Sequence, residues 1–388
     1  MPESIENAHL LEVRPLTPPA VVKERLPSPP AVQNRVRTAR ARIRDALHGR
    51  DRKRLVVVVG PCSIHDHDAA LDYALRLRRV MDRTDDALVI VMRTYFEKPR
   101  TTVGWKGLLN DPHLDGSCDI ATGIEQARRL LIDLNAAGVP CASEALDPVT
   151  PDYLADLLAW ASIGARTVES QTHRQMASGL SMPVGFKNGT DGRLEGATNA
   201  MIAAGEPHSF LGVSPDGRAA VVKTLGNPDR HVILRGGVGG PNHGPDSVAE
   251  ALGRVAGQGI ARPVMVDCSH GNSSKDPSRQ PEVCREVLEQ VRAGQEGLLG
   301  VMLESNLHPG AQTWQPGVEL AYGVSITDAC LGWEETEQLL DEIADTVRKR
   351  CESSARSEPR ASGGWAPGEQ AVREHRAQRA AGGRSRSS

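Results

Sequence analysis

The sequence is poor in aromatic side chains, lacks any long apolar run and carries little net charge. Aromatic residues make up 3% of its 388 residues, too few for the stacking platforms that bind single-stranded nucleic acid. No apolar run approaches the roughly 20 residues that a helix needs to cross a bilayer. The formal net charge of -3 gives no general attraction to nucleic acid or to a membrane surface. We therefore expect neither as a partner.

The chain also lacks a secretory signal and a disulfide framework. Its N-terminus has no basic segment followed by an apolar one. The seven cysteines are odd in number and scattered along the chain, which does not indicate paired disulfides. We predict a reducing, cytoplasmic location.

The two ends differ in composition from the centre. Residues 1–50 are predicted to form an N-terminal arm, proline-rich to residue 30 with room for one short strand, and then a basic helix over Val32–Leu47. Residues 353–388 are rich in Ser, Gly, Ala and Arg, and they have too little apolar surface to offset the entropy of ordering. We predict a disordered basic tail there and one large domain over residues 51–352.

Eight short apolar runs recur through this domain, at 55–63, 88–95, 140–146, 163–170, 183–189, 231–237, 263–270 and 300–305. Such runs, bounded by Gly or Pro, are typical of strands buried on both faces of a parallel sheet. Helical patterns lie between many of them. An open doubly wound sheet and a closed barrel both fit, but no GxGxxG or Walker-type loop follows any run. We therefore predict an α/β fold of the (β/α)8, or TIM barrel, type.

One segment is surplus to this pattern. Residues 209–224 are typical of two short strands joined by a turn near Asp216–Gly217. An inserted β-hairpin between the fifth and sixth barrel strands is not needed for closure. We therefore predict a role in regulation or in subunit contact.

Cationic side chains gather at the predicted carboxyl ends of the strands, where barrels place their active sites. They are Arg93, Lys98, Arg166, Lys187 and Arg235. A single such cation is more often solvated or ion-paired, but five together need an anion, and phosphate or carboxylate groups fit guanidinium bidentately. We therefore predict a small, highly anionic substrate.

Four potential metal ligands occupy the same predicted ends: Cys62, His270, Glu304 and Asp328. A single Cys after an apolar strand is usually a core residue, and no CxxC or HxxxH spacing links the four. If the barrel register holds, they form a mixed sulfur, nitrogen and oxygen site. Such a site suits one divalent ion such as Mn, Fe, Co or Zn.

Several long segments resemble the type I 3-deoxy-D-arabino-heptulosonate 7-phosphate (DAHP) synthases. They include GPCSIHD (60–66), RTYFEKPRTTVGWKGLLNDP (93–112), IGARTVESQTHR (163–174), PVGFKNGTDG (183–192), DCSHGNSSK (267–275), GVMLESNL (300–307) and SITDACLGWE (325–334). The resemblance implies a TIM barrel that condenses phosphoenolpyruvate with D-erythrose 4-phosphate and water, giving DAHP and phosphate. KPRTT (98–102) resembles the erythrose 4-phosphate loop of these enzymes, whereas the sister 3-deoxy-octulosonate 8-phosphate synthases, which use arabinose 5-phosphate, carry a different loop.

The resemblance also assigns roles to residues of this chain. It places the metal ligands on Cys62, His270, Glu304 and Asp328, and the phosphoenolpyruvate cations on Arg93, Lys98, Arg166, Lys187 and Arg235. It places the erythrose 4-phosphate contacts on Pro99, Arg100 and Thr101. Lys98 is our candidate general acid, with a pKa that we expect the surrounding cations to lower. Glu144 is our candidate for orienting or deprotonating the water; a counter-ion to the arginines is the alternative.

Members of this family usually bind phenylalanine, tyrosine or tryptophan beside the hairpin. The matching positions are Pro151, Leu180, Ser181, Phe210 and Val222. Asp152, Gly212 and the hairpin tip at 214–218 differ from a Phe-inhibited branch, so insensitivity to aromatic amino acids is an alternative. The resemblance further implies a homodimer or homotetramer. A catalytically silent, metabolite-sensing paralogue is a third possibility, against which the complete ligand and cation sets argue.

Overall fold

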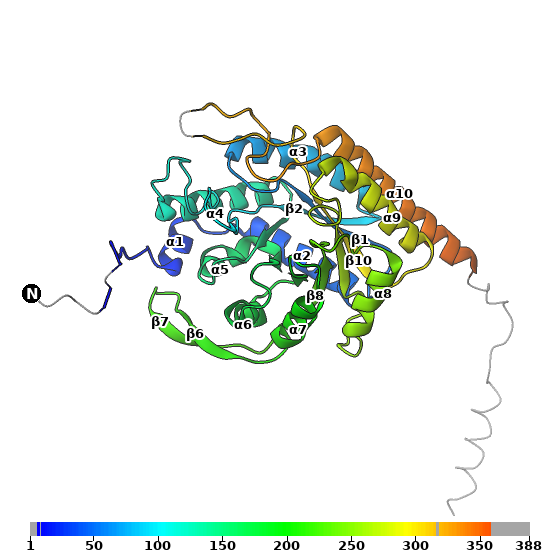
Figure 1. Ribbon diagram of the computed structural model, residues 1–388, viewed down its shortest axis with the longest axis horizontal. Coiled ribbons are helices and arrows are strands. Elements are labelled where there is room, and N and C mark those ends of the chain that lie inside the picture. Colours follow the sequence, from blue (N-terminus) through cyan, green and yellow to red (C-terminus); the bar gives the residue numbers. More distant parts are fainter. Residues whose placement is uncertain (1–5, 8, 316–317, 358–388) are drawn as a thin grey trace, which may run out of the picture. The chain divides into compact units, whose positions relative to one another are not determined.

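The computed structural model describes residues 6–7, 9–315 and 318–357, and its centre is a closed barrel of eight parallel strands (Figure 1). The barrel strands are β1 (Leu55–Gly60), β2 (Leu88–Arg93), β3 (Cys141–Glu144), β4 (Leu158–Ile163), β5 (Val184–Lys187), β8 (Arg230–Leu234), β9 (Val264–Asp267) and β10 (Leu298–Glu304). The first strand pairs with both β2 and β10, which closes the barrel. The predicted TIM barrel is therefore confirmed.

Helices follow the strands and cover the outside of the barrel (Figure 1). They are α3 (His67–Thr84), α4 (Ile120–Ala136), α5 (Thr150–Leu154), α6 (Gln171–Gly179), α7 (Glu195–Ala204), α8 (Pro245–Arg254), α9 (Gln280–Arg292) and α10 (Trp333–Ser357), with short 3₁₀ turns at Ala155–Leu157 and Pro277–Arg279. The side chain of Asp66 accepts a hydrogen bond from the backbone N–H of Ala69 and so caps α3. Gly138, with φ of +99°, lies just past the end of α4 and supplies the left-handed residue that stops many helices.

The last helix crosses the boundary predicted at residue 352. α10 continues to Ser357, so residues 353–357 are its final turn and a half. The rest of the predicted basic tail lies outside the described residues.

The N-terminal arm is helical only in part, because residues 10–18 have no regular secondary structure. It contains α1 (Pro19–Arg25) and α2 (Pro30–Leu47), so the basic helix is confirmed. The prediction of a short strand is wrong for the described part of the arm, which contains none. Both helices begin with proline, whose missing N–H costs nothing in the first helical turn. Ile43 and Leu47 of α2 pack into the cluster that fills the barrel interior.

The fourth strand lies earlier in the sequence than predicted. It spans Leu158–Ile163, whereas residues 165–169 form turns. The predicted strand at 163–170 is therefore displaced, because α5 and the following 3₁₀ turn are too short to show a helical period that would mark where the strand begins. Arg166 consequently lies on the loop beyond the strand rather than at its end.

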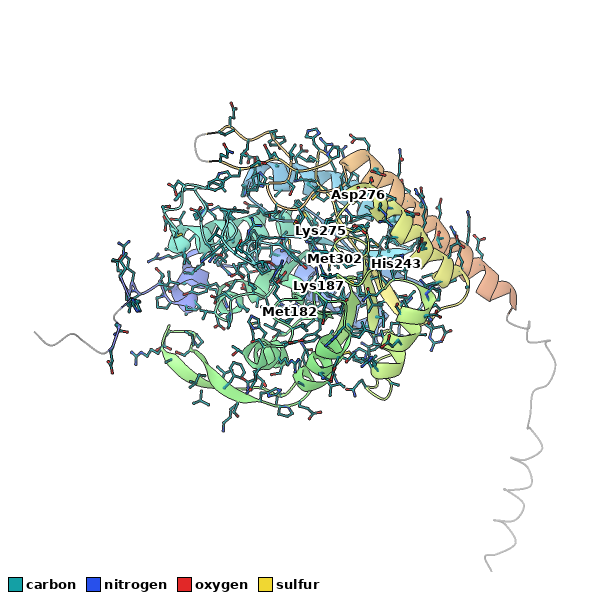
Figure 2. The ribbon with its side chains drawn as sticks, viewed as in Figure 1. Met182, Lys187, His243, Lys275, Asp276 and Met302 are labelled. Atoms are coloured by element: carbon teal, nitrogen blue, oxygen red, sulfur yellow. The ribbon has the colours of Figure 1, made fainter. Side chains whose placement is uncertain are left out.

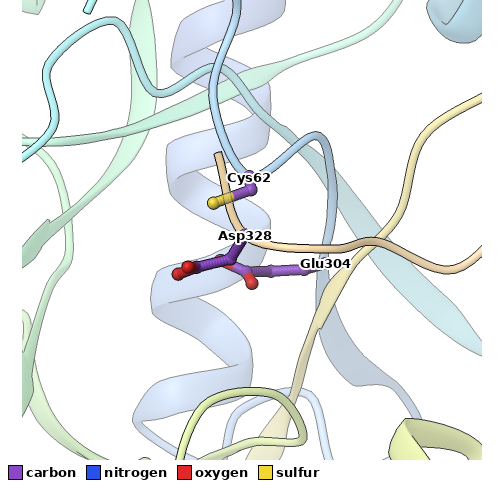
Figure 3. Close-up of side chains that lie close together, drawn as sticks. All are labelled: Cys62, Glu304 and Asp328. Atoms are coloured by element: carbon purple, nitrogen blue, oxygen red, sulfur yellow. The ribbon is translucent and has the colours of Figure 1, made fainter. Parts of the chain in front are cut away.

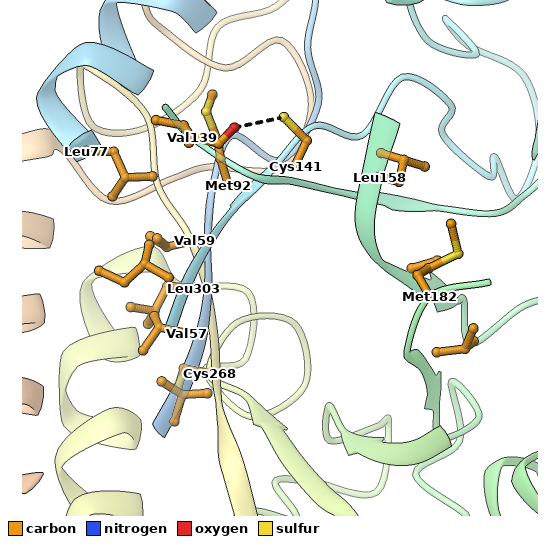
Figure 4. Close-up of a cluster of buried hydrophobic side chains, with 14 of the residues drawn as sticks. Val57, Val59, Leu77, Met92, Val139, Cys141, Leu158, Met182, Cys268 and Leu303 are labelled. Carbon is orange, nitrogen blue, oxygen red and sulfur yellow. Dashed lines mark hydrogen bonds between the residues drawn. The ribbon is translucent and has the colours of Figure 1, made fainter. Parts of the chain in front are cut away.

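Strand β1 shows why the apolar runs are continuous. Val56 and Val58 face the barrel interior, while Val57 and Val59 face outward against the helices, because successive side chains of a strand alternate. Figure 4 shows Val57 and Val59 beside Leu303, in the outer layer that also includes Leu77 of α3. Both faces are buried, so neither can be polar.

The inserted hairpin is confirmed. Strands β6 (Ser209–Val213) and β7 (Ala219–Lys223) form a separate two-stranded sheet, which lies beside α6 and α7 in Figure 1. Gly217 in its turn has φ of +82°, a conformation that favours glycine. The N–H of Ala20 donates to the carbonyl of Pro215 at 2.9 Å, so α1 contacts the hairpin tip.

Two further expectations concern cysteines and membranes. None of the seven cysteines forms a disulfide in the described part of the chain, which agrees with the prediction. Among the described residues, no helix is both long enough and apolar enough to cross a bilayer.

The barrel interior contains a buried histidine that should make stability depend on pH. His231 accepts a hydrogen bond from Trp160 Nε1 at 2.9 Å, and burial lowers the pKa of His231 to about 4. The unfolded chain therefore takes up this proton first as the pH falls below 6.5, the ordinary value. We expect about 2 kcal/mol of the free energy of unfolding to be lost between pH of about 7 and about 4.5.

Urea unfolding of the wild type and of His231→Gln at the two pH values measures this loss. Glutamine does not titrate, so the variant should lose less stability on acidification than the wild type. His9→Gln, a change of an exposed histidine, is the matched control and should behave as the wild type does. Equal pH dependence of His231→Gln and the wild type would contradict the prediction.

Candidate active site

A pocket of about 480 Å³ opens at the carboxyl ends of the barrel strands. The predicted site residues that line it are Arg93, Lys98, Pro99, Arg100, Glu144, Arg166, Lys187, Arg235, His270 and Asp328. Thr101 does not line the pocket and is exposed on the following loop. The structure thus brings together all five predicted cations.

The cations extend from the floor of the pocket to its rim. Arg93 is fully buried, whereas Arg166 and Arg100 are exposed. Arg93 donates from Nη2 to Glu304 Oε1 at 2.9 Å and from Nε to the carbonyl of Pro61 at 3.3 Å. The pocket thus combines a paired guanidinium on its floor with exposed guanidinium groups at its rim, which suits a substrate that carries negative charge.

Three of the four predicted metal ligands are within reach of a single ion (Figure 3). One ligand atom from each of Cys62, Glu304 and Asp328 lies within 4.8 Å of the other two. The fourth, His270, is outside this group, but its Nε2 is 3.7 Å from Glu304 Oε1. Cys62 and Glu304 are buried beneath the pocket, and Asp328 is exposed at its edge.

The chemistry of these donors fits a divalent transition metal. Burial would raise the pKa of Glu304, but His270, Arg93 and Lys98 lower it to about 2, so this carboxylate is ionised. Burial and Glu304 raise the pKa of the Cys62 thiol. A buried thiol beside two carboxylates is an unfavourable group of like charges when all are ionised, and a divalent cation would reverse that.

Lys98 is placed as predicted but has a different pKa. Its Nζ lies 3.1 Å from Cys62 Sγ and 3.2 Å from the Cys62 carbonyl oxygen. Burial would lower the pKa of Lys98, but Cys62 and Glu304 raise it above its ordinary value. The prediction of a lowered pKa is wrong, because the sequence does not show that anionic groups outweigh the neighbouring Arg93.

Glu144, at the end of β3, faces the same pocket. Its side chain is buried, and its Oε1 has no hydrogen-bond partner among the described residues. A Cβ at Gly164 would lie only 2.1 Å from this oxygen, so a larger residue there would displace the Glu144 carboxylate. A buried carboxylate oxygen without a partner is a site for water or for substrate.

The sequence analysis missed several residues of the pocket. Tyr95, Thr190, Ser274, Lys275 and Thr327 also line it. Tyr95 lies among the cations, with the guanidinium of Arg93 4.0 Å from its ring centroid and Lys187 Nζ at 5.9 Å; a ring face attracts such cations. Figure 2 labels Lys187, at the end of β5, and Lys275, in the loop after β9. Two of them could have been selected from the sequence, since Tyr95 and Lys275 lie in the segments 93–112 and 267–275 that resemble DAHP synthases.

A second, smaller cavity lies behind the active-site pocket. Its volume is about 20 Å³, and it is lined by Pro151 and Leu180 of the predicted effector set and by Glu97 and Glu144. Burial and Asp147 raise the pKa of Glu97 to about 8. The remaining predicted effector residues do not line the cavity. Ser181 is exposed next to Leu180, and Phe210 and Val222 are paired across the hairpin.

Comparisons with known proteins agree with this geometry. Residues 31–341 match the model of the DAHP synthetase I family. The chain is 52% identical over 342 residues to the Tyr-sensitive phospho-2-dehydro-3-deoxyheptonate aldolase of Escherichia coli, covering 88% of this chain and 96% of that protein. It is 51% identical over 345 residues to the Phe-sensitive enzyme of the same organism, covering 89% and 98%.

A solved structure is also similar. The phospho-2-dehydro-3-deoxyheptonate aldolase of Francisella tularensis superposes with a TM-score of 0.84 at 45% sequence identity. The match covers 88% of this chain and 99% of the other.

Proposed function

The chain belongs to the DAHP synthetase I family, and we propose that the pocket at the carboxyl end of its barrel is where it carries out that family's reaction. It is a transferase that condenses phosphoenolpyruvate with D-erythrose 4-phosphate and water, giving DAHP and inorganic phosphate. This is the first step of the shikimate pathway of aromatic amino acid biosynthesis. The main support for this assignment is that five cationic side chains line one pocket, next to a group of side chains that could bind a metal.

The cations bind the two phosphorylated substrates. Arg93, Lys187 and Arg235 are buried and would hold the carboxylate and phosphate of phosphoenolpyruvate, while Arg166 adds a contact from the loop after β4. Pro99 and Arg100, on the loop after β2, are proposed to hold erythrose 4-phosphate together with Thr101. Fixing both anions side by side replaces a bimolecular encounter by an oriented one, and the same cations stabilise the departing phosphate.

Cys62, His270, Glu304 and Asp328 would hold one divalent cation, which we propose to be Mn, Fe, Co or Zn. When bound, it supplies Lewis acidity for the aldehyde carbonyl or for the attacking water. The mixed sulfur and oxygen donors in Figure 3 support this proposal.

Two side chains would move protons. C3 of phosphoenolpyruvate attacks the aldehyde carbon, and Lys98 is proposed to donate a proton to the alkoxide oxygen that forms. Positive charge then develops at C2, where water adds. The unpartnered Oε1 of Glu144 is proposed to accept a proton from that water. Collapse of the resulting adduct breaks the bond from C2 to the phosphate oxygen and releases phosphate.

A phosphate-release assay with both substrates tests this function. We expect release that requires both phosphoenolpyruvate and erythrose 4-phosphate, stops with a chelator and returns with added Mn²⁺ or Co²⁺. Arabinose 5-phosphate in place of the tetrose should be a poor substrate, because KPRTT resembles the erythrose 4-phosphate loop. Faster turnover of arabinose 5-phosphate, or full activity under chelation, would count against the proposal.

We also propose that an aromatic amino acid regulates the enzyme through the surface between α6 and the hairpin. The relatives named above are Tyr-sensitive and Phe-sensitive, and Glu144 lines both the active-site pocket and the cavity beside Leu180. Tyrosine, phenylalanine or tryptophan should slow phosphate release, and Leu180→Asp should weaken that inhibition at least tenfold in effector concentration. Insensitivity to all three would contradict the proposal.

We propose that the chain forms a homo-oligomer through the outer face of the hairpin. Leu211 and Val221 are paired across the outer face of the hairpin and are 86% and 68% exposed. Apolar side chains so exposed are typical of contact surfaces. Light scattering should give a mass of a dimer or tetramer; a monomer would contradict the proposal.

A further inference from the structure

Asp267, the last residue of β9, contacts both the proposed metal site and the proposed phosphoenolpyruvate site. It is fully buried. Its Oδ2 lies 3.0 Å from Lys187 Nζ and 3.0 Å from His270 Nδ1. A substrate-binding cation and a metal ligand therefore share one carboxylate oxygen.

The other oxygen of Asp267 is held by hydrogen bonds. Oδ1 accepts from the backbone N–H of Ser269 at 3.0 Å and from its hydroxyl at 2.6 Å. Asn272 Nδ2 donates to the backbone carbonyl of Asp267 at 2.8 Å. The carboxylate is thus fixed in direction, and Oδ2, which no well-aligned hydrogen-bond donor among the described residues meets, lies at ion-pair distance from Lys187 and His270.

These bonds determine which nitrogen of His270 carries a proton. The hydroxyl of Ser269 gives its hydrogen to Asp267 Oδ1, so only its lone pairs face His270 Nδ1, 2.7 Å away. Nδ1 must therefore be the N–H donor. The lone pair of a neutral imidazole is then on Nε2, which is the nitrogen on the Glu304 side. That is the tautomer a metal requires.

The backbone conformation of His270 does not by itself fix the orientation of its ring. His270 has φ of +57°, a conformation that costs energy for a residue with a Cβ, and its carbonyl accepts from the N–H of Lys275 at 2.7 Å. The ring is held where it is by Ser269 and Asp267. A carboxylate that orients a metal-binding histidine typically contributes 10–100-fold to metal affinity.

Lys187 depends on the same group. Its side chain is 5% exposed, and Asp267 is its only ion-pair partner among the described residues. A buried ammonium without a partner is strongly unfavourable. Asp267 therefore keeps Lys187 charged at the pocket, where phosphoenolpyruvate is proposed to bind.

We propose that Asp267 is a positioning residue that couples the metal site to the phosphoenolpyruvate site, by fixing the His270 tautomer through Ser269 and by holding Lys187. This inference rests on the proposed function. It predicts a pattern across three variants: Ser269→Ala affects metal binding alone, Lys187→Met affects phosphoenolpyruvate alone, and Asp267→Ala affects both.

Titration of the purified chain with Co²⁺, followed by thiolate-to-cobalt charge-transfer absorption, measures the metal part. Cobalt affinity should fall about 10–100-fold in Asp267→Ala and detectably in Ser269→Ala. The KM for phosphoenolpyruvate should rise about tenfold in Asp267→Ala and in Lys187→Met, and stay within about twofold in Ser269→Ala when assays are saturated with Co²⁺. Asp276→Ala, an exposed carboxylate in the same loop, is the control and should change neither quantity.

Asp267→Ala leaves Lys187 buried without its counter-ion and could unfold. Asp267→Ala combined with Lys187→Met removes that problem, and its cobalt affinity should still be about 10–100-fold below that of Lys187→Met. The inference would be overturned if a folded Asp267→Ala enzyme, or the folded double variant, bound cobalt as tightly as the wild type does. Failure of the proposed metal site is distinguishable, because the wild type would then show no charge-transfer absorption that depends on Cys62.

Discussion

Cys62→Ala should reduce phosphate release by about 10³-fold or more while the barrel stays folded. The substitution removes the sulfur donor from a group whose other members are carboxylates and an imidazole. Lewis-acid stabilisation is worth several kcal/mol, and each 1.36 kcal/mol is about tenfold in rate. The cost to folding should be small, about 1–2 kcal/mol, because only one sulfur atom leaves a buried position.

Two measurements separate loss of metal from loss of fold. The wild-type rate should drop on chelation and recover with metal, whereas Cys62→Ala should show neither response. Cys141→Ala removes an equally buried thiol at the start of β3, which donates to the carbonyl of Val139 and lies away from the site (Figure 4). That control should retain metal binding and activity. A Cys62→Ala enzyme with near wild-type turnover would show that the sulfur is a core group and no ligand.

Lys98→Met should lower kcat by about 10²–10⁴-fold, the range for loss of a general acid. Lys98 Nζ is 3.1 Å from Cys62 Sγ, so it lies beside the proposed metal ligands and at the pocket surface. Burial would lower its pKa, but the negative groups Cys62 and Glu304 raise it. A divalent cation on those groups would offset their charge, so we expect the proton to leave Lys98 more readily in the metal-loaded enzyme.

Lys98→Arg distinguishes an acid from a counter-ion. Arginine keeps the charge but does not give up its proton at any usable pH, so kcat should stay low if Lys98 is the acid. The KM for phosphoenolpyruvate should then recover more than kcat does. Lys106→Met, a change to an exposed lysine that does not line the pocket, is the control and should leave kcat within about twofold. Recovery of kcat in Lys98→Arg would assign Lys98 to charge compensation alone.

Much of the fold could be predicted from the sequence, because the patterns that indicate strands and helix ends involve only neighbouring residues. A strand such as β1 is buried on both faces, so its sequence is apolar throughout, and Gly138 ends α4 through its own backbone conformation. Strand β4 was misplaced where the preceding helix is too short to show a period. The helix α1 was missed because proline at a helix start resembles proline in an extended segment.

Part of the site could be predicted because the carboxyl ends of the strands of a barrel meet at one end of it. That rule selects Arg93, Lys187 and Glu304 without knowledge of any distance. The rule does not show the role of Asp267, because its position at a strand end does not reveal that it contacts Lys187 and His270. Nor does it give the pKa of Lys98, which depends on whether anions or cations are nearer.

The order of residues by itself determined seven of the eight barrel strands, the inserted hairpin and the chemical types gathered at one end of the barrel, since burial and turn formation act over a few neighbouring residues. Only the tertiary structure decided which of these groups touch. β1 and β10 come from opposite ends of the domain and pair only when the barrel closes, and that closure brings Cys62 next to Glu304. Contacts of this kind depend on strand register and side-chain rotamers, which no local pattern encodes.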